Sequence, residues 1–508
     1  MSRYYLTTAI DYSNGDPHIG HAYEKVGADV VARFHRLVGE DVHFVIGMDE
    51  HGQKVAQEAA AQGRSPQELV DELAIRFEGV WERLYISHDD FIRTTEPRHK
   101  QAVQALVRRI QKTGDLYQDR YEGYYCTGCE AFKREAELED GRCPIPPTRE
   151  IAWTDEENWF FRLSEYTERL ISHIEQHPEF IQPESRRNEI LRLLEGGLDD
   201  ISASRSRVPW GVPFPDEDGH TVYVWFDALP NYISAIGYPG AEFGDRWPAA
   251  LHVIGKDITR FHCVIWPAML LSAGLELPGT VWGHGFVKIG GGKLSKSEAS
   301  LLDLDHLIDR HGPDAFRYFL MREIPWDRDR DFASVDAFLQ QFDERYNSDL
   351  ANDLGNLLNR TVSMALKYRD GVVTRSEATD LDSVIDSALD RYQATMREHR
   401  LHEGLDASMS IVRAANGFID AEQPWKLAKD PEQRARLDDV LAALVRALAA
   451  TAVTLEPFIP TKAVEMWRRL GGEELPSLEH LMAELPETLP PRWDTVLFPR
   501  AEIEAESD

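Results

Sequence analysis

The sequence of 508 residues predicts an α/β fold, in which a parallel sheet is split by an insertion and followed by an all-helical domain. Strand-like and helix-like segments alternate near the N-terminus, and this alternation returns after residue 222. A stretch rich in cysteine, aromatic residues and proline separates the two parts. From about residue 345 the apolar side chains have almost wholly helical spacing. Such alternation is typical of a Rossmann-like parallel sheet with helices on its faces.

The first strand, the first helix and the second strand can be placed from their side chains. Residues 3–10, with the sequence RYYLTTAI, are β-branched and aromatic and predict a buried strand. A helix is expected to follow, because apolar residues recur with a helical period at Ala22, Val26, Val30, Phe34 and Leu37. Gly39 is expected to end this helix. Residues 42–49, VHFVIGMD, predict the next strand.

The changes of pattern also predict the domain boundaries. In the last domain, Leu437, Leu441, Leu444 and Leu448 step by four, three and four, as on a helix of a bundle. The expected segments are the first half of the sheet domain at 1–115, a connective insertion at 116–222, the second half at 223–310, a linking region at 311–345, the helical domain at 346–500 and an acidic tail at 501–508.

The composition excludes some classes of partner. The formal net charge of −31 argues against broad binding to polyanions, so DNA is not an expected partner. The N-terminal residues lack the basic start and apolar core of a signal peptide, and no apolar run approaches the roughly 20 residues that span a bilayer. A cytoplasmic location without a membrane partner is therefore expected.

Two histidines lie where the first strand gives way to the first helix. His18 and His21 flank Ile19 and Gly20 in the tetrapeptide HIGH. Ligands of open parallel sheets bind beyond the carboxyl ends of the strands, where the free amides at the start of a helix favour phosphate. Imidazoles there can donate hydrogen bonds to the phosphates of a nucleotide, and Gly20 would leave room for adenine or ribose. The alternative interpretation is a capped helix with two ordinary surface histidines.

A second motif, GGGKLSKSEAS at residues 290–300, combines glycines with two lysines after a strand-like segment. A mobile glycine-rich loop with lysines can close over a triphosphate and neutralise the leaving pyrophosphate, although alone it is equally typical of a flexible basic surface loop. Together, HIGH and KLSKS resemble the signature pair of class I aminoacyl-tRNA synthetases. The resemblance implies ATP and Mg²⁺ as cofactors, His18, His21, Lys293 and Lys296 as catalytic residues, and Gly20, Ser295 and Ser297 as further ATP-binding residues.

Further segments are similar to those of methionyl-tRNA synthetases, in that family's order, from about Tyr4 to about Pro499. They include GMDEHGQK, YVWFDALPNY and HVIGKDITRFHCVIWPAML. The resemblance implies that Asp49 takes the ammonium group of L-methionine, whose side chain would lie among Ile10, Tyr12, Trp225, Ala228, Tyr232 and His262. An aromatic and apolar pocket suits a flexible, polarisable thioether. Without the resemblance, Trp225 and Tyr232 would be interpreted as core residues.

Three cysteines in the insertion, Cys126, Cys129 and Cys143, resemble a zinc knuckle of this family, but Pro146 stands where the fourth ligand, commonly a histidine, is expected. Proline cannot bind Zn²⁺. A tetrahedral site would need water, a nearby carboxylate or a side chain from elsewhere in the chain. The sequence therefore slightly favours a metal-free knuckle that is held together by packing.

In the helical domain, Asn356 and Arg360 are four residues apart and hence on one helix face, and Trp425 follows a proline. By resemblance, these residues read the CAU anticodon of tRNA(Met). The physical chemistry agrees, because unpaired loop bases are captured by stacking on aromatic rings and by hydrogen bonds to Asn and Arg. The alternative is a helix cap and a tryptophan of the bundle.

The resemblance therefore implies a methionine-tRNA ligase, which activates methionine with ATP to methionyl-adenylate and pyrophosphate and transfers it to the 3′ end of tRNA(Met), for translation initiation and elongation. Two alternatives remain. A class I enzyme for leucine, isoleucine, valine or cysteine would share both motifs, but the first three usually carry a longer editing insertion and the fourth binds Zn²⁺ through thiolates in its amino-acid pocket. A catalytically silent tRNA-binding paralogue is disfavoured by the intact histidines and lysines. Because no tRNA-binding module follows the helical domain, a monomer is expected.

Overall fold

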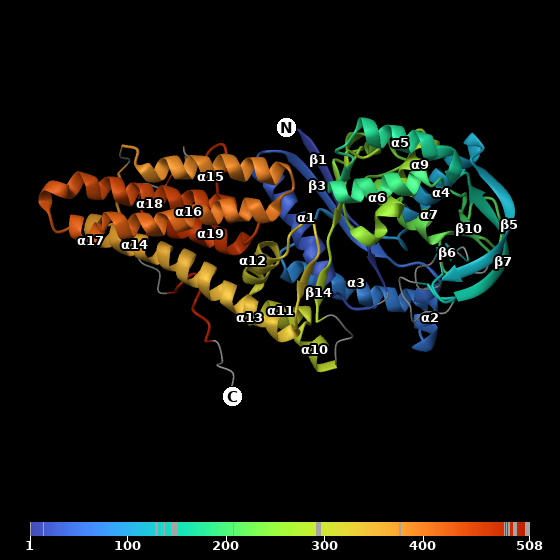
Figure 1. The fold of residues 1–508 in the computed structure, drawn as a ribbon, viewed down its shortest axis with the longest axis horizontal. Coiled ribbons are helices and arrows are strands. Elements are labelled where there is room, and N and C mark those ends of the chain that lie inside the picture. Colours follow the sequence, from blue (N-terminus) through green and yellow to red (C-terminus); the bar gives the residue numbers. More distant parts are fainter. Residues whose placement is uncertain are drawn as a thin grey trace.

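The structure, a computed structural model, describes residues 2–13, 15–126, 131–133, 135, 138–143, 151–206, 208–290, 296–374, 377–481, 483, 485, 488–490 and 495–502. At residues 131–133, 296, 297 and 299 it describes the backbone alone. The molecule is elongated, with a bundle of helices at one end, a sheet with helices in the middle, and the antiparallel strands of the insertion at the other end (Figure 1).

A parallel sheet forms the middle of the molecule. Its strands are β1 (Arg3–Thr8), β2 (Asp11–Tyr12), β3 (Asp41–Asp49), β4 (Asp90–Arg93), β8 (Ile181–Gln182), β12 (Leu251–Gly255) and β13 (Thr280–His284). The order is β4-β3-β1-β12-β13-β8, every pair is parallel, and β2 pairs with the end of β3. The predicted α/β class is confirmed. The first strand, predicted at 3–10, is observed at Arg3–Thr8, and β2 begins at Asp11 as a separate strand.

Helices cover both faces of the sheet. They are α1 (Ile19–Leu37) and α3 (Pro66–Arg83) on one face, and α4 (Pro97–Thr113) and α9 (Trp266–Ser272) on the other. Successive side chains of a strand point to opposite faces, so Tyr5 packs with α4 while Leu6 packs with α1. Three further helices border the sheet domain, namely α2 (Gln53–Ala61), α7 (Val224–Ala228) and α8 (Asn231–Ser234).

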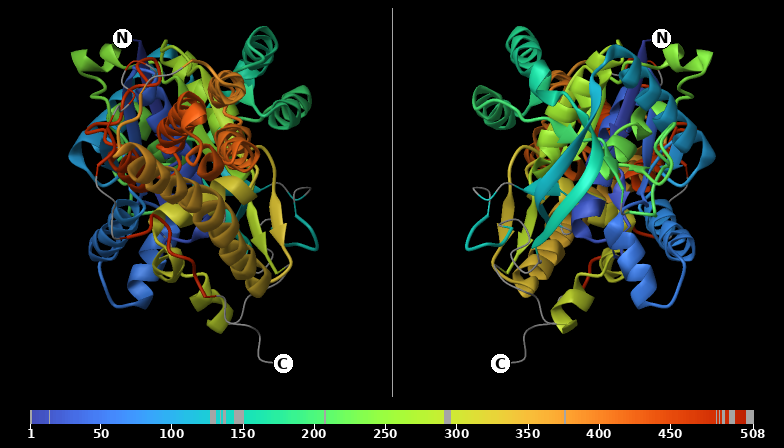
Figure 2. Two further views of the ribbon diagram at one scale, coloured as in Figure 1. Left: turned by 90° about the vertical axis from the view of Figure 1, so that its left-hand side faces the viewer. Right: turned by 90° about the vertical axis from the view of Figure 1, so that its right-hand side faces the viewer.

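The insertion forms an antiparallel sheet of β6 (Ala131–Lys133), β5 (Leu116–Cys126), β7 (Ile151–Phe161) and β9 (Ile201–Ser202). Figure 2 shows β5 and β7 as a twisted ribbon at the end of the molecule. Two helices lie between β7 and β9 in the chain, α5 (Thr167–Gln176) and α6 (Glu184–Glu195), with β8 between them. Because β8 pairs with β13, the insertion also contributes a strand to the edge of the central sheet. The predicted domain boundaries stay a prediction.

The linking region leads from the sheet to the helical domain. It contains β15 (Arg330–Phe332), which pairs with β14 (Val287–Ile289), and the helices α10 (Lys296–Leu301), α11 (Leu304–His311), α12 (Pro313–Glu323) and α13 (Val335–Arg345) nearby. The helical domain consists of α14 (Asn356–Arg369), α15 (Asp380–Arg397), α16 (Leu401–Glu422), α17 (Pro424–Leu427), α18 (Arg434–Leu455) and α19 (Pro460–Arg469). The predicted leucine stripe of α18 is buried, and its core is continuous with the core under α1.

A buried arginine joins the sheet domain to the helical domain. Arg317 of α12 is 0% exposed and donates to the carbonyl oxygens of Leu84 (3.0 Å), Pro457 (2.6 Å) and Phe458 (3.1 Å). Its guanidinium also lies 2.7 Å from a carboxylate oxygen of Asp29 on α1. Because these partners come from both domains, the guanidinium fixes how the two pack together.

The turn between α15 and α16 also contacts the sheet domain. His399 lies in this turn with a φ of 57°, and its Nε2 is 3.3 Å from the hydroxyl of Tyr4 on β1. The ring centroid lies 5.4 Å from that of Trp282 on β13. Burial, followed by the repulsion of His35, lowers the pKa of His399 to about 3. The neutral ring therefore belongs to the contact between the two domains.

No helix among the described residues is long and apolar enough to cross a bilayer.

Candidate active site

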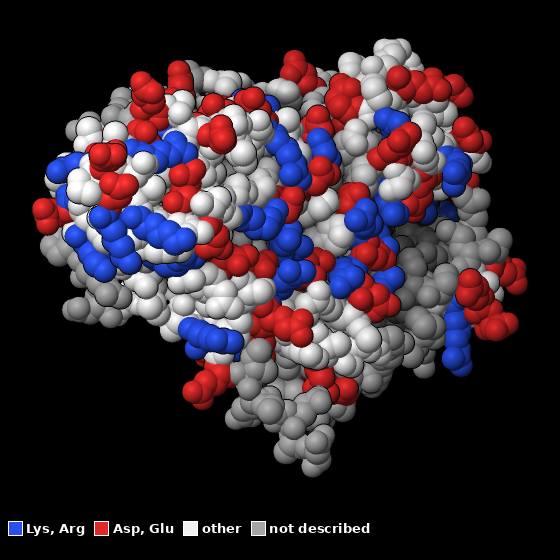
Figure 3. All heavy atoms as spheres, turned by 60° about the vertical axis from the view of Figure 1, so that its left-hand side comes forward, with Lys and Arg blue, Asp and Glu red and all other residues white. Residues whose placement is uncertain are grey.

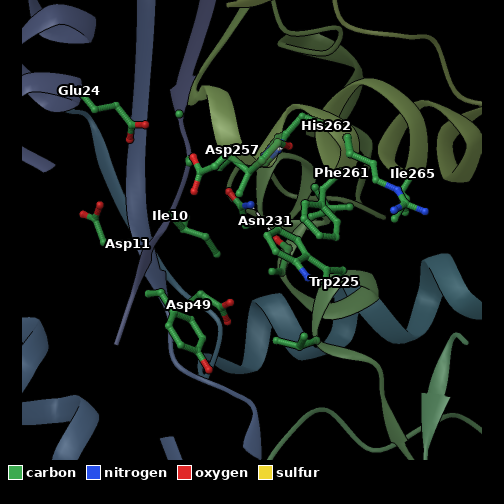
Figure 4. Close-up of a pocket in the computed structure, with 18 of the residues that line it drawn as sticks. Ile10, Asp11, Glu24, Asp49, Trp225, Asn231, Asp257, Phe261, His262 and Ile265 are labelled. Carbon is green, nitrogen blue, oxygen red and sulfur yellow. Dashed lines mark hydrogen bonds between the residues drawn. The ribbon is translucent and has the colours of Figure 1, made fainter. Parts of the chain in front are cut away.

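A cavity of about 960 Å³ opens beyond the carboxyl ends of the central strands. It is lined by residues that follow β1, β3, β12 and β13, which is where open parallel sheets bind ligands. The wall of this cavity contains the candidate residues for ATP and for methionine whose side chains the structure describes. They are Ile10, Tyr12, His18, Gly20, His21, Asp49, Trp225, Ala228, Tyr232 and His262. Figure 4 shows Asp49 and Ile10 facing Trp225 and Asn231 across the cavity.

The two histidines of HIGH together cap the first turn of helix α1. His18 is the N-cap of α1, and its Nδ1 accepts a hydrogen bond from the amide of Gly20 at 3.1 Å. In return, Nδ1 of His21 accepts a hydrogen bond from the amide of His18 at 3.2 Å, and the two rings stack with centroids 3.7 Å apart. Burial lowers the pKa of both rings. Because each Nδ1 is an acceptor, the neutral rings carry their proton on Nε2, where it can be donated to a ligand.

Gly20 protects this arrangement. A Cβ atom added at Gly20 would lie 3.1 Å from Cε1 and 3.2 Å from Nδ1 of the His18 ring. Even alanine would therefore require the ring of His18 to move by a few tenths of an ångström. The predicted role of Gly20, which is to leave room for adenine or ribose, stays a prediction.

The lysine motif lies at the edge of the described residues. Lys293 and Ser295 lie outside them, and Lys296 and Ser297 are described by their backbone alone, at the start of α10. Strand β14 leads toward this motif from the cavity, which its residues Val287 and Lys288 line. The predicted roles of both lysines and both serines therefore stay predictions.

Aromatic side chains form the wall that is proposed to hold methionine. Trp225 stacks on Phe261, with centroids 3.6 Å apart and planes at 8°. The hydroxyl of Tyr232 lies 2.6 Å from Nε2 of His262, whose Nδ1 lies 3.0 Å from the carbonyl oxygen of Ile258. Burial lowers the pKa of His262 to about 4. The ring is therefore neutral, with its proton on Nδ1, and accepts a hydrogen bond from Tyr232.

A buried ion cluster lies behind the histidines. Lys25 is fully buried and donates to Asp11 (2.8 Å), to Glu24 (2.8 Å) and to the carbonyl oxygen of Ala9 (3.0 Å). The other oxygen of Glu24 lies 3.0 Å from Nε2 of His284. Burial raises the pKa of Asp11 to about 7, whereas for Glu24 burial is outweighed by Lys25 and His284, which lower its pKa to about 2. The cluster ties the turn after β1 to the helix that carries both histidines.

Several cavity residues were missed by the sequence reasoning. Asn231 is buried and donates to the carbonyl oxygen of Ala228 at 2.7 Å, and burial raises the pKa of Asp257. Asn231, Asp257 and Phe261 line the cavity, and so do Asp11, Glu24 and His284 of the ion cluster. The local pattern gives no signal for the cluster, because a helical apolar pattern assigns charged residues such as Glu24 and Lys25 to the solvent.

The predicted knuckle is only partly described. Cys126 ends β5 and Cys143 is buried, but Cys129 and Pro146 lie outside the described residues. Within the described part of the chain, no group of three or more His, Cys, Asp or Glu side chains could hold a metal ion. The metal-free knuckle that the sequence slightly favours therefore stays a prediction.

The predicted anticodon residues lie on neighbouring helices. Asn356 is exposed at the start of α14, and Arg360, one turn later, donates to Asp420 of α16 at 3.3 Å. Trp425 lies just beyond α16 and is 37% exposed, so part of its ring faces the solvent. Figure 3 shows Lys and Arg side chains gathered on the outer part of the helical domain, despite the strongly negative net charge.

Comparisons with known proteins agree with this geometry. The family model described as tRNA synthetases class I (M) matches residues 4–150 and 136–362. The methionine-tRNA ligase of Caldanaerobacter subterraneus subsp. tengcongensis is 43% identical over 513 residues, covering 99% of this chain and 80% of that protein. The methionine-tRNA ligase of Thermotoga maritima is 44% identical over 490 residues, covering 94% of this chain and 77% of that protein.

A solved structure is similar over nearly the same length. The structure of Mycobacterium tuberculosis methionyl-tRNA synthetase in complex with methionyl-adenylate superposes with a TM-score of 0.93 and 40% identity, covering 98% of this chain and 100% of that one. Fold, cavity and sequence thus agree over nearly the full chain, which belongs to the methionine-tRNA ligase family of class I tRNA synthetases.

Proposed function

We propose that the chain activates L-methionine with ATP to methionyl-adenylate and pyrophosphate, and then transfers methionine to the 3′ end of tRNA(Met). The observation that carries the proposal is a single cavity in which the paired donors of His18 and His21 lie beside an aromatic pocket and the carboxylate of Asp49. These groups match the phosphates, the side chain and the ammonium of the reactants.

In the first step, a carboxylate oxygen of methionine forms a bond to the α-phosphorus of ATP while the bond to pyrophosphate breaks. The Nε2 protons of His18 and His21 stabilise the charge that develops on the phosphates, and Lys293 and Lys296 neutralise the pyrophosphate that leaves. Mg²⁺ would enter with ATP, since it is commonly held by substrate phosphates and few protein ligands, and when bound it offsets their negative charge. The enzyme mainly positions the reactants and stabilises charge.

The pocket discriminates methionine by shape and by polar contacts. Trp225, stacked on Phe261, offers an apolar face to the thioether. Because the Tyr232 proton is donated to His262, the hydroxyl oxygen of Tyr232 can accept but not donate toward the substrate. Asp49, at the end of β3, supplies the charge that holds the ammonium group.

In the second step, a ribose hydroxyl of the terminal adenosine attacks the carbonyl carbon of the adenylate, and AMP leaves. The cavity extends to residues of the insertion, among them Tyr121, Phe160 and Ser202, which leaves space for that nucleotide. Asn356, Arg360 and Trp425 would read the CAU anticodon. We also propose that the chain acts as a monomer, in the cytoplasm, where translation uses charged tRNA.

An exchange assay tests the proposal. The chain is incubated with ATP, labelled pyrophosphate and each of the twenty amino acids in turn, and label entering ATP is measured. Exchange with methionine alone, followed by charging of tRNA(Met) but not of the same tRNA with a changed anticodon, is expected. Exchange with leucine, isoleucine, valine or cysteine, or with none of the twenty, would refute the proposal.

A further inference from the structure

A fully buried carboxylate lies directly behind the methionine wall. Asp227 belongs to α7, between Trp225 and Ala228, and is 0% exposed, with its side chain outside the cavity lining. One oxygen accepts a hydrogen bond from Nε2 of His99 on α4 at 2.9 Å. The other oxygen lies 2.8 Å from Nδ1 of His51, without the alignment of a hydrogen bond. Both rings are themselves buried.

His99 makes a second polar contact on the other side of its ring. Its Nδ1 lies 3.0 Å from the hydroxyl oxygen of Ser234, whose own proton is donated to the carbonyl oxygen of Asn231 at 3.1 Å. His99 therefore bridges the carboxylate of Asp227 and the hydroxyl of Ser234, and its Nε2 proton is donated to Asp227. In agreement, the two histidines outweigh burial and hold the pKa of Asp227 well below its usual range.

The contacts of His99 fix two helices that are too short to be stable alone. Helix α7 has five residues and α8 has four, whereas α4 has seventeen. His99 on the long helix contacts Asp227 of α7 and Ser234 of α8. Since α7 and α8 carry Trp225, Ala228 and Tyr232, this one imidazole holds the wall that faces the substrate side chain.

The second contact of Asp227 reaches the opposite side of the pocket. His51 lies two residues after Asp49, in the segment that follows β3. The indole of Trp210 packs edge-on against His51, with centroids 5.4 Å apart, and donates to the carbonyl oxygen of Glu50 at 2.6 Å. The position of Asp49 relative to the aromatic wall is thus set through Asp227.

We propose that Asp227 is a positioning residue for methionine binding, which acts through His99 and His51 to hold Asp49 and the aromatic wall at the spacing that the ammonium group and the thioether require. The inference rests on the proposed function. It predicts that a change at Asp227 weakens methionine binding but not ATP binding. The ATP side of the cavity is built from other elements, namely α1 and the residues after β12 and β13.

The test compares methionine and ATP binding in matched variants. Asp227→Asn keeps the shape of the side chain and an oxygen toward His99 but removes the charge. We expect the Kd for methionine, measured by calorimetry, to rise about 100-fold, as small misplacements of a binding group can cause, while the Kd for ATP changes less than about twofold. Saturating methionine should restore most of the exchange rate. The double variant Asp227→Asn with His99→Gln should lose no more affinity than the worse single variant.

Arg98→Ala is the matched control. Arg98 precedes His99 on the same helix and forms an ion pair with Asp90, 2.6 Å apart, with 43% and 21% of the side chains exposed. Its loss should leave methionine affinity within about twofold of the wild type. If Asp227→Asn does not fold, His51→Gln, which removes the less aligned contact, is measured in its place.

Two results would overturn the inference: unchanged methionine affinity in the folded variant, or an equal loss of methionine and ATP affinity. The wild type separates this failure from that of the proposed function. A wild-type chain that binds no methionine refutes the proposed function itself, whereas a wild type that binds methionine beside an unaffected variant refutes only the role of Asp227.

Discussion

Acid should weaken the contact between the two domains through His399. The pKa of this buried ring is about 3, far below the value of about 6.5 of a histidine in the unfolded chain. Between these two values the unfolded chain binds a proton that the folded chain does not, so the contribution to stability is fully present above pH 6.5 and is lost as the pH falls. From pH 8 to pH 5 this one residue should remove about 2 kcal/mol from the free energy of unfolding.

The matched variant is His399→Asn. Asparagine tolerates the positive φ of 57° at this turn but does not titrate. Urea unfolding of both proteins, followed by circular dichroism at pH 8 and pH 5, gives the two acid-induced losses of stability. The other buried histidines contribute equally to both proteins, so the loss should be about 2 kcal/mol smaller in the variant. Equal losses in the two proteins would refute the argument, because the proton would then not be taken up at His399.

Three further predictions concern single side chains. Lys296→Ala should lower the rate of pyrophosphate exchange about 100-fold or more while methionine binding by calorimetry stays nearly intact; lost methionine binding would contradict the assigned role. Arg317→Met should cost about 3 kcal/mol in urea unfolding, because three buried carbonyl groups lose their donor while Asp29 keeps Arg33 at 2.8 Å, and an unchanged midpoint would show that the guanidinium contributes nothing net. Trp425→Ala should raise the KM for tRNA(Met) about tenfold or more, through the loss of base stacking, with exchange unchanged; an equal effect on both reactions would argue against anticodon reading.

Much of the fold follows from local patterns in the sequence. The strand predicted at 42–49 is observed at Asp41–Asp49, and the leucine stripe of the predicted bundle helix is buried. Both are strong because side-chain periodicity reports directly on which face is buried. The candidate residues for methionine converge on one cavity because the carboxyl ends of parallel strands meet at one edge of the sheet.

Buried charge could not be predicted in the same way. Lys25, Asp227 and Arg317 are each 0% exposed, yet a pattern of apolar residues assigns charged side chains to the solvent. The burial of Asp227 and Arg317 depends on partners that are distant in the chain, as His99 is from Asp227 and Leu84 is from Arg317. Such pairings are a property of tertiary structure, since charges stay buried only where other elements complete their hydrogen bonds.

The strand that the insertion returns to the central sheet limits how the enzyme can be shortened. β8 covers the outer side of β13 at Val281 and Trp282. A truncated protein without residues 116–222 would leave this row of backbone amides and carbonyls bare, and bare strand edges recruit strands of other molecules. Shortened versions of this enzyme should therefore retain residues 181 and 182 with their flanking helices. Deletion of the whole insertion would give a smaller protein that aggregates.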